Sequence, residues 1–244
     1  MRRASPAAYG VVLLALAACT GAPAPDHTVT VLAAASLTEA FGQVSADFER
    51  EHPGVTVEVS YGSSATLVQQ VNQGAPAELI ALAGEAAAEP LDRSRVTESR
   101  IFTANLLEIA VPPSNPGRVR ELRDLGRAGL KVVLCAEAVP CGRAADATFA
   151  RAGVSPSVVS REVDVKATLS KVRLGEADAA VVYHSDVVAA RGAVTGVPIP
   201  QQLNTRLRYP VLLLGDDPSA RAFVDFLVGD RGQQTLRSLG FASP

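Results

Sequence analysis

The feature that most constrains the fold is the alternation of short apolar runs with segments of helical periodicity. The run Val29–Ala33 suits a buried strand, and Phe41 and Phe48 lie near helical spacing within the next segment, residues 38–51. Residues 55–61 then alternate between apolar and polar side chains and are rich in β-branched residues, which is typical of a strand. Because this order continues along the chain, it predicts an α/β fold with parallel-type sheets flanked by helices.

Further elements are expected downstream in the same order. Strands are predicted at 79–83, 106–111, 131–134 and 179–182, and helices at 65–73, 141–152, 165–174, 217–229 and 231–239. We expect two lobes, with the chain leaving the first near 106–111 and returning near 209–214. The predicted division puts 28–107 and 211–244 in lobe 1 and 108–210 in lobe 2. A ligand cleft is expected between them, where strand ends and helix starts converge.

The N-terminal segment is expected to stay outside the fold. Two arginines precede an apolar stretch, residues 9–18, that is too short to span a bilayer. The stretch ends at residues 16–19, whose sequence LAAC resembles a bacterial lipobox. The resemblance implies a signal peptide over residues 1–18, a lipidated Cys19 and a flexible tether over residues 19–27. An ordinary signal peptide followed by a coincidental cysteine is the alternative.

Cysteine usage agrees with an exported chain. With Cys19 lipidated, Cys135 and Cys141 remain as a pair, separated by a turn-like segment. A metal-binding or redox-active role for the two cysteines is less favoured, because their spacing is not C-x-x-C and no histidine lies nearby. Since disulfides persist in exported proteins, we predict a structural disulfide between these two residues.

Composition narrows the classes of partner and reaction. The formal net charge is -2 and tryptophan is absent, so neither nucleic-acid binding nor a stacking platform is indicated. His27, in the predicted tether, and His52, at a helix end, are expected to be exposed, and His184 near the cleft is expected to be a bystander. A G-x-S-x-G elbow is absent, and histidines and carboxylates do not cluster. We therefore expect neither an enzyme nor a metal receptor, and no cofactor.

Small and hydroxyl-bearing residues gather where predicted strands meet predicted helices. Ser36 and Glu39 form a Ser-x-x-Glu capping box at the first junction. At the second junction Gly62 is followed by Ser63 and Ser64, either of which suits the N-cap. Each motif alone is more often only a helix cap. Free N–H groups and the helix dipole at such junctions nevertheless favour an anion.

Three further segments extend this pattern. Pro140 and Cys141 open one predicted helix, and Asp164 suits the N-cap of another that begins at Val165. Tyr183 ends a predicted strand, where its hydroxyl either lies in water or donates to a ligand. None of these motifs supplies the cationic clamp that a flat carboxylate would want. Together they indicate a small dianion held by dipoles and neutral hydrogen-bond donors.

These segments resemble the periplasmic molybdate-binding proteins of bacterial ABC importers, from about residue 29 to residue 241. The most specific pieces are AAASL at 33–37, GSSATL at 62–67, QGAPA at 73–77, VPCG at 139–142 and VVYHSD at 181–186. The resemblance implies a two-lobed periplasmic binding protein fold of type II. It also implies that the chain captures molybdate or tungstate and delivers it to the permease and ATPase of an importer. Sulfate or another tetrahedral oxyanion on the same scaffold is the alternative.

The resemblance also implies the residues of the site. It assigns five residues to the oxyanion through hydroxyls or backbone amides: Ser36, Ser64, Cys141, Val165 and Tyr183. Ser63 is the close alternative to Ser64, and the only metal implied is the molybdenum or tungsten of the oxyanion. The family usually has Asp at the positions of Glu78 and Gly84, so the geometry near Gly84 is expected to differ. We expect a monomer, tethered through Cys19 to the outer face of the cytoplasmic membrane.

Overall fold

The computed structural model describes residues 27–244, so the predicted signal peptide and the lipidation of Cys19 lie outside the described residues. The strands are β1 His27–Ala34, β2 Val55–Gly62, β3 Leu79–Ala81, β4 Glu98–Val111, β5 Val132–Cys135, β6 Val158–Glu162, β7 Ala179–Tyr183, β8 Thr195–Pro198 and β9 Arg206–Leu213. The α-helices are α1 Thr38–Glu51, α2 Ser64–Asn72, α3 Pro140–Ala152, α4 Val165–Arg173, α5 His184–Ala189, α6 Pro218–Val228 and α7 Asp230–Ser238. The short 3-10 helices are η1 Ala35–Leu37, η2 Glu85–Ala88, η3 Arg93–Arg95 and η4 Leu122–Gly126. His27, predicted as the last tether residue, instead begins β1.

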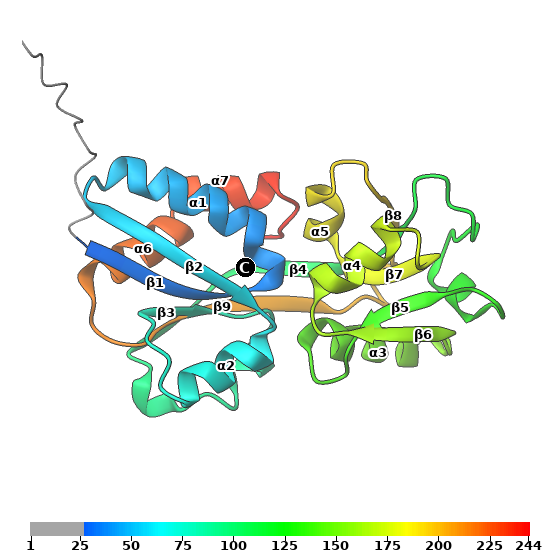
Figure 1. Ribbon diagram of the computed structural model, residues 1–244, viewed down its shortest axis with the longest axis horizontal. Helices are drawn as coiled ribbons and strands as arrows, with labels where there is room; N and C mark the ends of the chain where they lie inside the picture. Colours follow the sequence, from blue (N-terminus) through cyan, green and yellow to red (C-terminus); the bar gives the residue numbers. More distant parts are fainter. Residues whose placement is uncertain (1–26) are drawn as a thin grey trace, which may run out of the picture.

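The strands form one path in the order β2-β1-β3-β9-β4-β7-β5-β6, with β8 paired to β4. Figure 1 shows this path as two α/β lobes, one built around β1 to β3 and the other around β5 to β8, with β4 and β9 running between them. The predicted two-lobed α/β class is therefore confirmed. The sheet is mixed rather than parallel, because β9 pairs antiparallel with β3 and β4, and β4 pairs antiparallel with β7 and β8.

The long strand β4 changes partner between the lobes. Its first part pairs with β9 as far as Leu106 opposite Arg206. From Leu107, which lies opposite Tyr183, it pairs with β7 instead. Because β4 changes partner here, we propose that lobe 1 comprises residues 28–107 and 211–244. Lobe 2 then comprises residues 108–210.

Each lobe buries both faces of its sheet, which explains why its strands read as continuous apolar runs. In β1, Val29 and Val31 belong to the core under α1 and α6, whereas Leu32 belongs to a second core with α2. Figure 1 shows α1 and α7 on one side of this sheet and α2 on the other. Phe223 of α6 packs edge-on against Phe41 of α1, with ring centroids 5.9 Å apart.

Most predicted elements are present with small shifts of their ends. Helix α1 has the predicted bounds, but β4 begins at Glu98 rather than at residue 106. Strand β6, strand β8 and helix α5 were not predicted. These elements depend on tertiary contacts rather than on a local sequence pattern. Strand β6 is a half-buried edge strand paired to β5 alone, and α5, with only 6 residues, is too short to show a clear helical periodicity.

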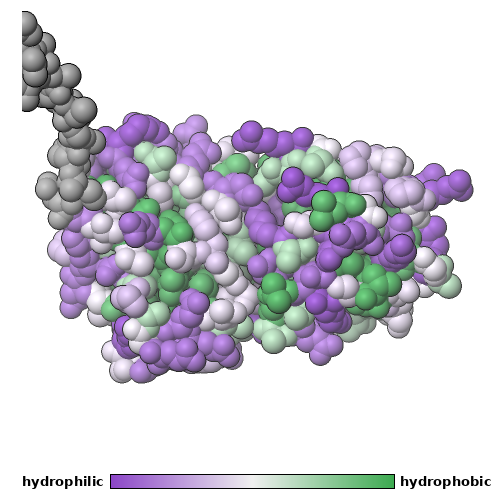
Figure 2. Space-filling view, viewed as in Figure 1, coloured by the Kyte–Doolittle hydropathy of each residue, from purple (hydrophilic) through white to green (hydrophobic). Residues whose placement is uncertain are grey.

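The face of the molecule seen in Figure 2 is mostly polar. Figure 2 shows hydrophilic side chains over most of one face, with smaller hydrophobic groups on both lobes. Over residues 27–244, no helix has both the length and the apolar character needed to cross a bilayer.

Candidate functional site

A small cavity lies between the lobes, where strand ends meet helix starts. Its volume is about 20 Å³. This exceeds the roughly 10–15 Å³ that one water molecule needs, so the cavity suits a ligand of a few heavy atoms. The lining comprises Ala34, Ala35, Ser36, Gly62, Ser63, Ser64, Ala83, Val139, Pro140, Cys141, Asp164, Val165 and Tyr183. All six predicted oxyanion residues, the alternative Ser63 included, therefore meet at one cavity.

Ser36 lies in η1, immediately after β1, and is buried. Its Oγ lies 3.1 Å from the Oη of Tyr209, which comes from β9. The predicted capping box is wrong: the N-cap of α1 is Leu37, which makes no side-chain cap bond, and Glu39 pairs with Lys166 instead. The physical reason is the extra turn η1, which separates the strand from the helix and turns the Ser36 hydroxyl away from the cap position.

Ser63 and Ser64 divide two tasks at the second junction. Ser63 is the N-cap of α2, because its side chain accepts the backbone N–H of Thr66 at 3.2 Å. Ser64 is buried, and its Oγ accepts the backbone N–H of Ala83 at 3.0 Å. The Ser64 oxygen is thereby fixed, while its own hydroxyl proton stays available to donate into the cavity.

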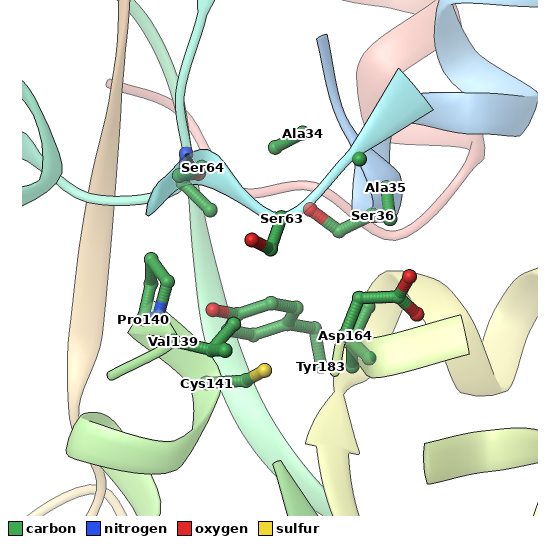
Figure 3. Close-up of a pocket in the computed structure, with 13 residues that line it drawn as sticks. Ala34, Ala35, Ser36, Ser63, Ser64, Val139, Pro140, Cys141, Asp164 and Tyr183 are labelled. Carbon is green, nitrogen blue, oxygen red and sulfur yellow. Dashed lines mark hydrogen bonds between the residues drawn. The ribbon is translucent and has the colours of Figure 1, made fainter. Parts of the chain in front are cut away.

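Cys141 and Val165 bring the starts of two helices to the opposite wall, as Figure 3 shows for Cys141 beside Asp164 and Tyr183. Helix α3 begins with Pro140, so the Cys141 amide lies in the first turn, where backbone N–H groups lack partners within the helix. Asp164 is the N-cap of α4, as predicted, and accepts the N–H of Ala167 at 2.8 Å. Val165 is the first residue of α4 and is buried.

A disulfide joins Cys135, at the end of β5, to Cys141. It closes the short segment that carries Val139 and Pro140 along the cavity wall. Both cysteines are buried, so the bond is shielded from solvent. The wall that presents the Cys141 amide is therefore attached covalently to the central sheet of lobe 2.

Tyr183 supplies a donor with no partner of its own. The residue is 1% exposed, and within residues 27–244 no protein atom hydrogen-bonds its hydroxyl. Burial raises the pKa of this phenol well above its ordinary value, with the nearby Tyr209 and Asp186 adding to the effect. The hydroxyl therefore stays protonated at neutral pH. A buried donor without an acceptor costs free energy, so an acceptor on a bound ligand would satisfy it.

The charges around the cavity favour an anion held by neutral groups. No Lys or Arg occurs among the lining residues of the described chain, and the one acidic residue, Asp164, is engaged as a helix cap. The buried Asp186 does not line the cavity and lies beside Lys166. Hydroxyls and the starts of α2, α3 and α4 remain as the attractive groups.

None of the three histidines lines the cavity. His184 pairs with Glu108 at 2.6 Å and does not line the cavity. His27 pairs with Asp217 at 2.9 Å, and the ring of His52 contacts the Phe48 carbonyl at 3.0 Å, so neither is simply solvated. In the described part of the chain, no three His, Cys, Asp or Glu side chains gather as a metal site would require.

Sequence reasoning missed the contact of Tyr209 with Ser36, which lies behind the cavity wall. The residue was placed in a returning strand, but only the paired β4 and β9 bring it under Ser36. Gly84, by contrast, was expected to alter the local geometry. Its φ of 92° suits glycine, and a Cβ there would lie 3.3 Å from the Leu207 side chain.

Two α/β lobes that enclose a small donor-lined cavity define the class of two-lobed solute-binding proteins. Residues 29–242 match the family described as bacterial extracellular solute-binding protein. The molybdate-binding protein ModA of Mycobacterium tuberculosis (strain H37Rv) is 34% identical over 223 residues, which cover 89% of this chain and 85% of ModA. The chain therefore belongs to the bacterial extracellular solute-binding protein family, as its sequence motifs predicted.

Solved structures agree on the fold. The periplasmic molybdate-binding protein of Azotobacter vinelandii matches with a TM-score of 0.77 at 19% identity, covering 88% of this chain and 99% of that chain. The sulfate-binding protein SubI of M. tuberculosis H37Rv matches with a TM-score of 0.78 at 20% identity, covering 89% of this chain and 87% of SubI. Both relatives are binding proteins by name, and at these identities they bear on the fold alone.

Proposed function

We propose that this protein captures molybdate or tungstate outside the cytoplasm and delivers it to an ABC importer. The observation that carries the proposal is the cavity itself, where buried hydroxyls and helix starts converge without a cation among the described lining residues. Such a site suits a permanently charged, small dianion that needs many donors and no acceptor. The sequence similarity to the molybdate-binding protein ModA adds support, since it extends over most of both chains.

The proposed contacts use every wall of the cavity. Ser36, Ser64 and Tyr183 donate their hydroxyl protons, and Cys141 and Val165 donate backbone amides. Ser63 is a weaker candidate, because its oxygen already caps α2. No catalytic step and no cofactor belong to this role.

Location and partners follow from the same proposal. The chain is proposed to work as a monomer, held at the outer face of the cytoplasmic membrane by a lipid on Cys19. Its partners are the permease and ATPase of the importer. Mass spectrometry of the membrane-extracted protein tests the anchor: a diacylglyceryl adduct on an N-terminal Cys19 supports it, and an intact or unmodified N-terminus contradicts it.

Sulfate is the second candidate, because the fold matches SubI as well as the Azotobacter protein. Both anions are tetrahedral and doubly charged, so the difference rests on the size that the closed cavity accepts. A thermal-shift panel of molybdate, tungstate, sulfate, phosphate and chromate at equal concentration separates them, because a bound ligand raises the melting temperature by mass action. The largest shift is expected with molybdate or tungstate. A response to sulfate alone would replace molybdate by sulfate, and no response to any anion would defeat the proposed function.

A further inference from the structure

A partly buried ion cluster lies beside the cavity and joins the two lobes. The Nζ of Lys166, in α4, lies 2.6 Å from the Oε2 of Glu39, in α1. The same Nζ lies 3.0 Å from the Oδ1 of Asp186, in α5. Helix α1 belongs to the lobe of β1, whereas α4 and α5 belong to the lobe of β7, so one ammonium group bridges a carboxylate from each side (Figure 1).

The two ion pairs of Lys166 differ in what they connect. Asp186 has no exposed side-chain surface and comes from the same lobe as Lys166, so this pair compensates a buried charge within lobe 2. The Glu39 side chain is 43% exposed and comes from the other lobe. The Glu39 bond is therefore the part of the cluster that has to break when the lobes separate.

The positions of these residues link the cluster to the cavity. Glu39 stands three residues after Ser36, at the start of α1, and Lys166 directly follows Val165, at the start of α4. Ser36 and Val165 both line the cavity, from opposite lobes. A bond between Glu39 and Lys166 consequently holds two proposed ligand-binding walls at a fixed separation.

Resting on the proposed function, we propose that the Glu39–Lys166 ion pair is a latch that keeps the lobes closed over the bound oxyanion, with Asp186 positioning Lys166. Glu39 and Lys166 are positioning residues, since neither lines the cavity. The latch acts on release: ligand leaves only after the lobes part, so its loss raises the dissociation rate more than it lowers the association rate.

The sign of the effect separates a latch from a purely electrostatic role. Glu39, Asp186 and Lys166 together carry a net negative charge beside an anion site. Neutralising Glu39 would therefore tighten anion binding if only long-range charge mattered. A latch predicts the opposite, because the same change removes the bond that crosses the cleft.

The test is the substitution Glu39→Gln, which leaves Lys166 paired with Asp186 and so does not strand a buried carboxylate. Glu176→Gln is the matched control, because Glu176 pairs with Lys171 at the same 2.6 Å but within lobe 2. Calorimetry and ligand-exchange kinetics with molybdate are measured on the full chain. We expect Glu39→Gln to weaken the Kd by about 2- to 5-fold, mainly through faster dissociation, as loss of a partly exposed ion pair would do. Glu176→Gln should leave both constants unchanged.

Unchanged or tighter binding in Glu39→Gln would overturn the latch while leaving the proposed function intact. If the wild-type protein binds none of the anions of the thermal-shift panel, the proposed function has failed and small-angle X-ray scattering decides about the latch. In that case a larger radius of gyration of Glu39→Gln than of wild type supports the latch, and identical scattering overturns it.

Discussion

The hydroxyl of Tyr209 lies 3.1 Å from the hydroxyl of Ser36, although the two residues are 173 positions apart. Tyr209 belongs to β9, which runs between the lobes, and Ser36 belongs to η1 on the wall of the cavity. When Tyr209 is the donor of this bond, the Ser36 proton is free to donate into the cavity. A strand that connects the lobes thereby orients a proposed ligand-binding hydroxyl.

The buried Ser36 and Ser64 are expected to contribute to molybdate affinity, whereas Ser63 is expected to contribute to folding stability. Ser36→Ala and Ser64→Ala should each weaken molybdate binding by roughly 1.5–3 kcal/mol, the usual contribution of a hydrogen bond to a charged group. Ser63→Ala should instead cost about 1 kcal/mol of folding stability through the lost cap of α2. Calorimetry and urea unfolding of the three variants measure both quantities. Wild-type affinity in both Ser36→Ala and Ser64→Ala would contradict the site.

Tyr183→Phe is expected to change stability and affinity in opposite directions. Without ligand, the substitution removes a buried hydroxyl that has no partner in the described chain, so unfolding should cost about 1 kcal/mol more. With ligand, the same hydroxyl is a proposed donor, so the thermal shift produced by molybdate should shrink. Melting curves with and without molybdate measure both effects. A lower melting temperature without ligand would show that the hydroxyl already has a partner.

The covalent link behind the cavity wall is expected to support both folding and binding. The entropy of closing the short loop between Cys135 and Cys141 predicts a loss of about 2 kcal/mol when both are replaced by Ala. Because the segment that carries Val139 and Pro140 then loses its attachment, molybdate affinity should fall as well. Urea unfolding and calorimetry of the double variant provide the measurement, and the wild type treated with reductant under denaturing conditions and then refolded is the control. Unchanged affinity would show that the helix start alone fixes this wall.

Two glycines in helices are expected to respond oppositely to alanine. A Cβ on Gly142, in the first turn of α3, would lie 2.1 Å from the Ala136 carbonyl oxygen, so Gly142→Ala should destabilise the fold by about 3 kcal/mol or more. A Cβ on Gly42, inside α1, meets nothing within 4 Å, and Gly42→Ala should stabilise by about 0.5–1 kcal/mol. Thermal melting of the pair checks the contrast. Equal melting temperatures would mean that the loop at Ala136 moves aside freely.

Stability is expected to fall steeply at alkaline pH. Burial raises the pKa of the Tyr183 and Tyr209 phenols. Burial lowers the pKa of Lys166, but the carboxylates of Asp186 and Glu39 more than offset this, so its pKa is also raised. All three groups then hold protons more tightly in the folded chain than in the unfolded chain.

The stability from these three groups is fully present below their ordinary pKa values of 10.0 and 10.5, and it is lost as the pH rises toward the raised values. The free energy of unfolding should drop by about 1.4 kcal/mol per pH unit for each group in that window. Urea unfolding in steps above pH 10.5 gives the slope. Tyr183→Phe should reduce the slope by the share of one group, and an unaltered slope would contradict the assignment.

Local patterns predicted most of the scaffold, because apolar periodicity and helix caps depend on neighbouring residues. The bounds of α1 and the cap at Asp164 are examples of predictions that need no tertiary information. The starts of the helices that bear the candidate residues could be predicted for the same reason. The gathering of Ser36, Ser64 and Tyr183 at one cavity followed from a resemblance to a family rather than from spacing.

What could not be predicted depends on contacts between distant segments. The Ser36 hydroxyl was expected to cap α1, but β9 brings Tyr209 to it instead. Likewise, Glu39 was interpreted as half of a capping box, whereas its partner Lys166 is 127 residues away. Side chains that bridge the lobes leave no local trace, so sequence reasoning assigned them the nearest local role.

The pairing of β9 with β3 and β4 also determines when the chain can fold during its synthesis. Lobe 1 begins with β1, but its sheet and its aromatic core are completed by β9 and by Phe223 of α6, near the C-terminus. A nascent chain that has not yet reached this segment lacks the strand that closes the first lobe. The two halves of lobe 1 are thus synthesised at the beginning and at the end of translation. Truncation at the C-terminus should therefore unfold lobe 1, which contains the part of the protein that was synthesised first.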